Sequence, residues 1–245
     1  MTEEQDLAGR VIVVTGASRG IGYFTAIEAA NRGAHVIAIA RTVGGLEDLD
    51  DEIQAAGGSA TLVPMDLMDG DAIDRMGRAI FERWGKLDAL IGNAGMLGSI
   101  TPVSHLDPKE VDKVFKLNVT ANFRLIRSLE PLLKQSDAGR VLFVSSSSAY
   151  SCKPYWGLYA ATKAALNAMA KSYAGEHANT PLNINVVNPG PTRTQMRAKA
   201  VPGENPDTLP HPREIAPKFV DLITPSYTEN GQFIDLKNNG ETSPL

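Results

Sequence analysis

A tyrosine and a lysine four residues apart are the residues of this chain best suited to acid–base chemistry. They are the first and last residues of the run Tyr159-Ala-Ala-Thr-Lys163, which lies early in a predicted helix. Residues four apart lie on one helical face, so the lysine ammonium can lie near the phenol. A lysine about 4 Å away, at an effective dielectric of about 20, supplies about 4 kcal/mol, enough to lower a tyrosine pKa of about 10 by about three units. We expect Tyr159 to act as a general acid and base and Lys163 to lower its pKa, although a half-buried tyrosine and a surface lysine can share this spacing.

A serine row precedes this pair along the chain. Ser146 stands thirteen residues before Tyr159, within Ser145–Ser148, directly after a predicted strand. A hydroxyl there can donate to a substrate oxygen and hold it against the tyrosine. We take Ser146 as the candidate, and the sequence leaves open which serine of the row faces the site.

A glycine-rich turn joins the first predicted strand to the first predicted helix. The run Thr15-Gly-Ala-Ser-Arg-Gly-Ile-Gly22 has the spacing G-x-x-x-G-x-G, with Gly16, Gly20 and Gly22 as its glycines. Glycines permit a tight turn and a close backbone approach to a diphosphate, while the amides at the helix start face the anion. The turn therefore predicts a dinucleotide site, and the alternative is a glycine-rich turn that binds nothing.

Two arginines indicate which dinucleotide would bind. A carboxylate at the end of the second strand would bind the ribose 2′-hydroxyl of NAD, but this strand ends in Ala40-Arg41 without an acid. Arg19 and Arg41 together can clamp a 2′-phosphate. We expect NADP(H) to be preferred over NAD(H); the alternative is two solvated surface arginines.

Strand-like and helix-like segments alternate along the chain, which is typical of βαβ units with a parallel sheet. We predict a single α/β domain over residues 1–245, a doubly wound, mostly parallel, seven-stranded Rossmann-type sheet with helices on both faces. The predicted strands are 11–15, 35–40, 60–65, 88–91, 140–145, 183–188 and 232–236, and the predicted helices are 21–31, 45–56, 69–84, 108–133, 158–177 and 214–223.

The predicted strand ends all carry small or polar residues, and in an open α/β sheet ligands bind beyond the carboxyl ends of the strands. Because these ends meet at one edge, the residues should line one site. They are Thr15-Gly16, Arg41, Asp66, Asn93-Ala94-Gly95, Ser145-Ser146 and Asn188-Pro189-Gly190.

Composition excludes several classes of protein. The 245 residues are 43% hydrophobic and 21% charged, with a net charge of −4, which argues against general affinity for nucleic acid or anionic membranes. One cysteine, Cys152, suits a reducing compartment, and no stretch approaches the roughly 20 apolar residues of a membrane span. The polar, acidic N-terminus does not resemble a signal peptide, so we expect a cytoplasmic protein. The four histidines are dispersed, and we expect no metal site.

The ordered set of motifs resembles the short-chain dehydrogenase/reductase family in its compact single-domain form, and in particular a little-characterised bacterial subgroup. The resemblance runs from about Leu7 to Gly240. The motifs that carry it are Thr15–Gly22, Asp66, Asn93-Ala94-Gly95, Asn118, Ser146, Tyr159, Lys163 and Pro189-Gly190.

The resemblance implies a role for each matching residue. The catalytic residues would be Asn118, Ser146, Tyr159 and Lys163, with Asn118 supporting a proton-carrying water and Lys163 also holding the nicotinamide ribose. From the chain alone, Asn118 is equally a tolerated polar residue inside a helix. Cofactor contacts would come from Gly16, Ser18, Arg19, Gly20, Ile21, Gly22, Arg41, Asp66, Leu67, Asn93, Ala94, Gly95, Tyr159, Lys163, Pro189, Gly190, Thr192 and Thr194. Asp66 and Leu67 would flank the adenine. A homodimer or homotetramer is also implied.

The expected function is hydride transfer between NADP(H) and a small-molecule carbonyl or secondary alcohol. The alternatives are a module that senses NADP(H) without turnover, and an unrelated doubly wound protein that binds another phosphate ligand. The irregular, proline-rich stretch at 190–217 predicts a substrate lid. Tyr155, Trp156, Met96 and Leu97 form either an apolar substrate wall or part of the core, and the substrate itself stays open.

Overall fold

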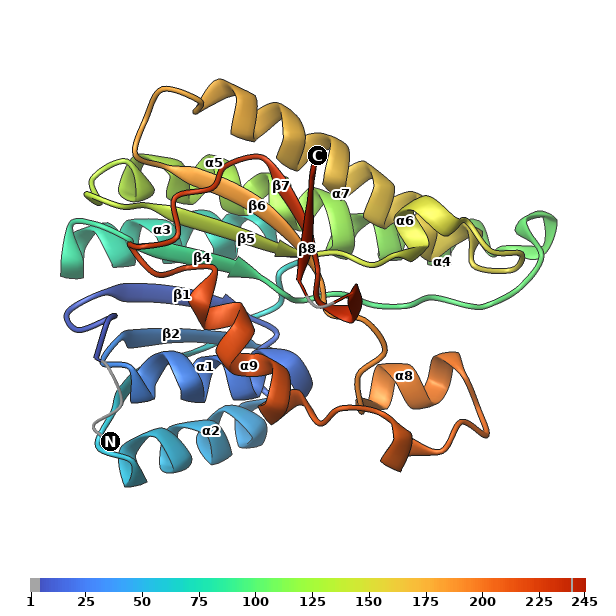
Figure 1. The fold of residues 1–245 in the computed structure, drawn as a ribbon, viewed down its shortest axis with the longest axis horizontal. Coiled ribbons are helices and arrows are strands. Elements are labelled where there is room, and N and C mark those ends of the chain that lie inside the picture. The colour runs from blue at the N-terminus through green and yellow to red at the C-terminus, as the bar shows by residue number, and fades with distance from the viewer. Residues whose placement is uncertain (1–4, 239) are drawn as a thin grey trace.

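One eight-stranded sheet between two layers of helices forms the framework of the protein (Figure 1). The computed structural model describes residues 5–238 and 240–245. The strands are β1 (Val11–Thr15), β2 (His35–Ala40), β3 (Ser59–Pro64), β4 (Ala89–Gly92), β5 (Arg140–Val144), β6 (Asn183–Asn188), β7 (Gln232–Asp235) and β8 (Glu241–Pro244). Their order is β3-β2-β1-β4-β5-β6-β7-β8, which confirms the doubly wound fold.

The prediction of seven strands is wrong by one. β8 pairs with β7 and is antiparallel to it, with Phe233 opposite Ser243, whereas every other neighbouring pair is parallel. All four residues of β8 are exposed. A short, polar, exposed strand lacks the apolar run or alternation from which the other strands were predicted.

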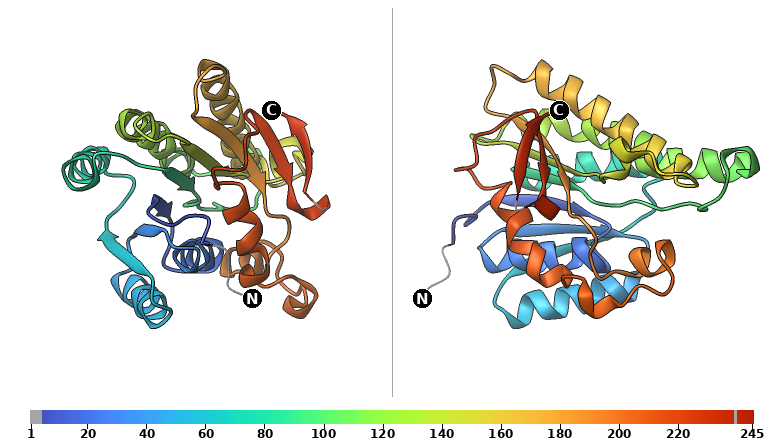
Figure 2. Two further views of the ribbon diagram at one scale, coloured as in Figure 1. Left: turned by 60° about the vertical axis from the view of Figure 1, so that its left-hand side comes forward. Right: turned by 45° about the vertical axis from the view of Figure 1, so that its right-hand side comes forward.

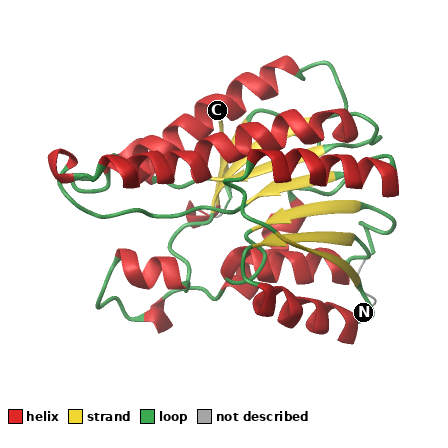
Figure 3. Cartoon of the chain, turned by 180° about the vertical axis from the view of Figure 1, so that it is seen from behind, coloured by secondary structure: helices red, strands yellow, loops and turns green. Residues whose placement is uncertain are grey.

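Helices cover both faces of the sheet, and Figures 2 and 3 show the strands between the two layers. α1 (Gly20–Asn31), α2 (Val43–Ala55) and α9 (Pro212–Asp221) lie on one face; α3 (Gly70–Trp84), α5 (Ala121–Leu133) and α7 (Gly157–Glu176) lie on the other. β1 is buried along its whole length: Ile12 and Val14 pack toward α1, and Val11 and Val13 pack toward α3 and α5. A strand covered on both faces needs apolar residues at consecutive positions, which explains the run VIVVT.

The helix predicted over 108–133 is divided into three parts. α4 (Pro108–Phe115) passes into a π-helical segment, Lys116–Thr120, and then into α5. Just after this segment, the side chain of Asn122 in α5 donates through Nδ2 to the carbonyl oxygen of Asn118, at 2.8 Å. π-helical turns inside α-helices often mark functional sites, and this one contains Asn118.

The stretch 190–217 is more ordered than the sequence indicated. It contains α8 (Gln195–Ala200), a 3₁₀ turn at Pro206–Thr208, and the start of α9. His211 and Glu214 form a reciprocal cap there, so α9 begins two residues before the predicted start at Glu214. α8 and the short helix α6 (Ser148–Ser151) lie at the right of Figure 1. No helix in the described part of the chain is long and apolar enough to cross a membrane.

Candidate active site

The glycine turn is built for close contact with a backbone neighbour. Gly16 and Gly20 have φ values of +69° and +62°, a conformation that glycine adopts without strain. A Cβ atom on Gly16 would lie 2.9 Å from Nδ2 of Asn93, so a larger residue would displace that side chain. The Asn93 amide donates through Nδ2 to the carbonyl oxygens of Thr15 and Gly16, at 2.8 and 3.3 Å. In this structure Asn93 therefore holds the turn in shape.

Thr15, expected at the site edge as a strand end but without a role of its own, links the turn to the end of β4. Its Oγ1 accepts from the backbone N–H groups of Asn93 and Ala94, at 2.9 and 3.0 Å, and donates to the carbonyl oxygen of Ile91. The side chain is buried. In the sequence, the sign of this role is a hydroxyl residue immediately before the first glycine, because a threonine at a strand end can form hydrogen bonds with the backbone of a neighbouring loop.

The two arginines expected to select NADP lie at the surface beside this turn. Arg19 precedes the first residue of α1, and Arg41 follows β2; both are exposed. A Cβ atom on Gly45 of α2 would lie 2.7 Å from the carbonyl oxygen of Ser18, so the α2 end packs on the glycine turn. Within residues 5–238 and 240–245, neither guanidinium group forms an ion pair. Both charges are therefore available to an anion.

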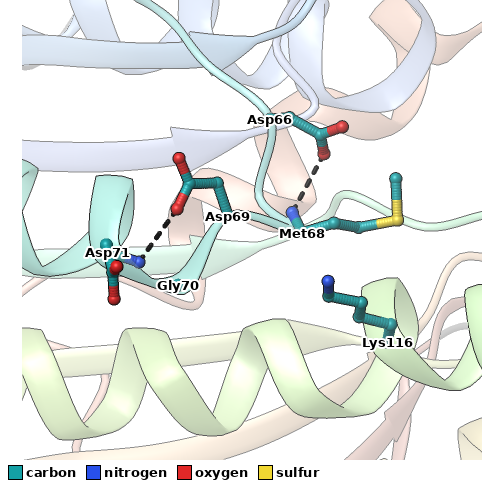
Figure 4. A pocket seen from close by; sticks show the side chains of 6 residues that line it. All are labelled: Asp66, Met68, Asp69, Gly70, Asp71 and Lys116. Atoms are coloured by element: carbon teal, nitrogen blue, oxygen red, sulfur yellow. Dashed lines mark hydrogen bonds between the residues drawn. The ribbon is translucent and has the colours of Figure 1, made fainter.

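An open cavity lies beside the predicted adenine contacts (Figure 4). Its volume is about 520 Å³, and Lys116 projects into it from the π-helical segment opposite Asp66 and Met68. Oδ1 of Asp66 accepts from the backbone N–H of Met68 at 2.9 Å, which fixes the loop after β3. The lining residues are Asp66, Met68, Asp69, Gly70, Asp71 and Lys116. A second cavity, of about 230 Å³, borders it and includes Leu67.

Lys163 is buried where β4, β5 and α7 meet. Its Nζ donates to the carbonyl oxygen of Val144, the last residue of β5, at 2.7 Å, and lies 5.6 Å from the centre of the Tyr159 ring. A Cβ atom on Gly95 would lie 3.6 Å from this Nζ and 3.4 Å from Oδ1 of Asn118. Lys163, Tyr159, Asn118 and the strand ends thus gather at one place, as the topology predicted.

Burial sets the pKa values of the Tyr159–Lys163 pair in the absence of a bound ligand. It raises the pKa of the half-buried Tyr159 phenol to about 12 and lowers the pKa of the Lys163 ammonium to about 8. The pKa of the phenol is therefore shifted upward by desolvation, opposite to the lowering by Lys163 that the spacing predicts. The lysine ammonium donates to a backbone carbonyl.

Asn118 clamps the loop after β4 against α7. Its Oδ1 accepts from the backbone N–H of Met96, and its Nδ2 donates to the carbonyl oxygen of Met96 and to Oγ1 of Thr162, all at 2.9–3.0 Å. The side chain is fully buried. Asn118 is thus more than a tolerated polar residue, since it holds Gly95 and Met96 next to Lys163.

Burial separates Ser145 from the other three serines of the row. Ser145 is 2% exposed, and its backbone N–H donates to the carbonyl oxygen of Val187, whereas Ser146 is partly exposed. Oγ of Ser146 accepts from the backbone N–H of Ser148 and donates to Oγ of Ser148, at 3.2 and 3.1 Å. Ser146 is therefore the first serine after β5 whose hydroxyl is accessible.

The loop after β6 connects the strand edge with the glycine turn. Gly190 has a φ of +72°, and Oγ1 of Thr192 donates to its carbonyl oxygen at 3.3 Å. Thr194 caps α8 by accepting from the backbone N–H of Arg197, and a Cβ atom on Gly20 would lie 3.5 Å from Cγ2 of Thr194. The start of the predicted lid thus adjoins the dinucleotide turn. No three His, Cys, Asp or Glu side chains among the described residues form a group that could hold a metal ion.

Comparison with known proteins assigns this arrangement to a family. The family model of short chain dehydrogenases matches residues 10–205, which span the glycine turn, Ser146, Tyr159 and the loop after β6. The chain belongs to the short-chain dehydrogenase family. It is therefore an oxidoreductase of the kind that acts on CH–OH groups with a nicotinamide dinucleotide.

The relatives of this short-chain dehydrogenase include bacterial and fungal oxidoreductases. The oxidoreductase YciK of Escherichia coli is 38% identical over 224 residues, covering 90% of this chain and 88% of its own. A benzil reductase of Saccharomyces cerevisiae that forms (S)-benzoin is 34% identical, covering 89% of this chain and 83% of its own. A Shigella flexneri short-chain dehydrogenase in complex with NADP is 36% identical, with a TM-score of 0.91 and coverage of 96% and 100%.

Proposed function

We propose that this short-chain dehydrogenase reduces a small-molecule carbonyl with NADPH, and runs the reverse reaction on the secondary alcohol. The observation that carries the proposal is the position of Tyr159, which is partly exposed beside a buried lysine at the edge where the strand ends meet. The alternative of a non-catalytic sensor gives no reason for the accessible serine hydroxyl and the phenol at this edge.

The residues present fit a nicotinamide dinucleotide, because the glycine turn lets the backbone come close to a diphosphate at the start of α1, and the two arginines beside it form no ion pair among the described residues. We propose that the residues expected to contact the cofactor hold it: the Gly16–Gly22 turn at the diphosphate, Asp66 and Leu67 at the adenine, Asn93 to Gly95 beside the ribose, and Pro189 to Thr194 at the nicotinamide. The bound cofactor supplies or accepts the hydride.

The chain's own groups would handle the substrate oxygen and its proton. Ser146 donates a hydrogen bond that orients and polarises the carbonyl. Tyr159, protonated at neutral pH because its pKa is high, gives its proton to the oxygen as negative charge develops there. Lys163 fixes the end of β5 and holds the ribose. Residues 190–217 would close over the substrate as a lid.

The preference for NADP(H) rests on Arg19 and Arg41, and two relatives crystallised with NADP or NADPH support it. Replacing both arginines by alanine removes both charges facing the 2′-phosphate, so we expect KM for NADPH to rise about tenfold to a hundredfold. KM for NADH should change less than threefold. Steady-state kinetics with both cofactors provide the measurement.

The control is a second double variant, in which the exposed Arg75 and Arg78 are replaced by alanine. It removes the same number of positive charges. An equal loss with NADPH and NADH, or a similar loss in the control, would show that these arginines do not read the 2′-phosphate.

A further inference from the structure

The loops on either side of the site are fixed to each other. The backbone N–H of Thr101, in the loop after β4, donates to the carbonyl oxygen of Tyr155, in the loop before α7, at 3.1 Å. A Cβ atom on Gly157 would lie 2.7 Å from Cγ2 of Val103, so the two loops also pack closely. Tyr155 has a φ of +73°, a costly conformation for a tyrosine, and this hydrogen bond holds it in place.

Large apolar side chains are exposed on these two loops. Ile100 is 37% exposed, Val103 68% and Tyr155 58%, and Trp156 beside them is partly exposed. We call these four residues the apolar rim. Tyr155 is thus not a core residue. Apolar side chains that gather next to a reactive group, instead of being scattered singly, indicate a binding surface.

Trp156 connects the rim to the reaction centre. Its ring centre lies 6.3 Å from that of Tyr159, with the planes at 66°. A carbonyl oxygen hydrogen-bonded to the Tyr159 hydroxyl lies about 2.7 Å from it. Aromatic rings pack at centroid separations of roughly 4.5–7 Å, a distance that a ring attached to such a carbonyl can span.

Two arginines of the lid region, Arg193 and Arg197, are engaged with other lid residues, whereas Arg213 pairs with Glu52 of α2. The guanidinium group of Arg197 forms two hydrogen bonds with the carboxylate of Glu204, both at 2.6 Å. Arg193 pairs with Asp207 at 3.3 Å and donates to the carbonyl oxygen of Leu209. These two charges therefore hold the lid region together, while the apolar rim lies beside Tyr159 through Trp156.

We infer that the substrate carries an aromatic or comparably flat apolar group next to its carbonyl, and that Trp156 is the residue against which this group packs. The inference rests on the proposed reductase function and names the substrate class of that site. Tyr155, Val103 and Ile100 form the outer part of the same surface.

A matched pair of neutral keto esters tests the inference through turnover. Wild-type protein should show a kcat/KM at least tenfold higher for ethyl benzoylformate than for ethyl pyruvate, followed as NADPH oxidation. Trp156→Ala should reduce this ratio about tenfold, mainly through KM for the aromatic ester, and Trp156→Phe should restore most of it. Phe81→Ala, an exposed aromatic on α3, should leave the ratio unchanged. A ratio near one, or a ratio unaffected by Trp156→Ala, would overturn the inference.

A binding measurement separates recognition from catalysis. Trp84→Phe leaves Trp156 as the single tryptophan. In the NADP⁺-saturated variant, Trp156 emission should change saturably with ethyl benzoylformate and not with ethyl pyruvate, whereas Trp156→Phe, which keeps Trp84, should show no saturable change. Saturable binding without turnover of either ester would reject the reductase function and retain aromatic recognition. Turnover without this emission change would retain the function and reject the inference.

Discussion

Lys163 shows how one buried residue can make ligand binding depend on pH. Burial lowers the pKa of its ammonium to about 8, so the charge is present below that pH and is lost as the pH rises through it. A neutral amine forms weaker hydrogen bonds to ribose oxygens than an ammonium does. We therefore expect the Kd for NADPH, measured by fluorescence titration, to rise about threefold to tenfold between about pH 7 and about pH 9.5.

Two variants isolate this effect. Lys163→Met should bind NADPH more weakly at all pH values and without the rise, whereas Lys171→Met, an exposed lysine on the same helix, should keep the wild-type pH dependence. A rise that persists in Lys163→Met would assign the pH dependence to another group.

For single residues, the sequence predicted where Tyr159 and Lys163 lie better than it predicted the pKa of the phenol. The spacing of Tyr159 and Lys163 is a local property of one helix, and the structure confirms that both lie near the ends of the strands. The direction of the tyrosine pKa shift was wrong because it depends on how deeply the folded chain buries the phenol, which the spacing of two residues in one helix does not determine.

At the scale of elements, the starts of β1, β4 and β5 are joined by a buried ion cluster. Asp88, 2% exposed, accepts from Arg10, Ser136 and the backbone N–H of Val11, at 2.6–3.0 Å, and pairs with Lys86. Burial alone would raise the pKa of Asp88, but hydrogen bonds from Ser136, Val11 and Lys86 outweigh it and lower that pKa. The cluster lies at the opposite ends of the strands from Tyr159, so its role is in stability.

We expect Asp88→Asn to lower the free energy of unfolding by about 3 kcal/mol at pH 7, because Lys86 loses its carboxylate partner and the largely buried Arg10 keeps only the exposed Asp137. The folded-state pKa lies below the unfolded value of about 3.9, so the contribution is present above that pH and disappears as the pH falls through the folded value. Denaturant unfolding at about pH 7 and about pH 3 measures both. Asp112→Asn, on the exposed face of α4, is the control. A difference from wild type that is as large at pH 3 as at pH 7 would contradict this account.

Elements were predictable where burial imposes a pattern. The bounds of β1, β2 and β6 agree with the structure because each is a continuous apolar or mixed run that ends at a polar or glycine signal. β8 and α8 were missed, since exposed polar segments carry no periodicity. The π-helical segment was also missed, because it depends on the particular bonds of Asn118 and Asn122.

At the scale of the whole molecule, the alternation of strands and helices predicted a doubly wound, mostly parallel sheet, which the structure confirms, and the edge strand β8 is the correction. The extent of the domain, assembly into a homodimer or homotetramer and a cytoplasmic location stay predictions. They depend on surfaces and partners outside a single chain.

The central claim, that Tyr159 transfers the proton during carbonyl reduction by NADPH, is tested most directly by Tyr159→Phe. The variant keeps the ring that packs on Trp156 and loses only the hydroxyl. We expect kcat for NADPH oxidation with a reducible carbonyl to fall about a thousandfold, while the Kd for NADPH changes less than threefold. Retention of more than about a tenth of wild-type kcat, with the cofactor bound normally, would contradict the assignment of Tyr159 as the proton donor.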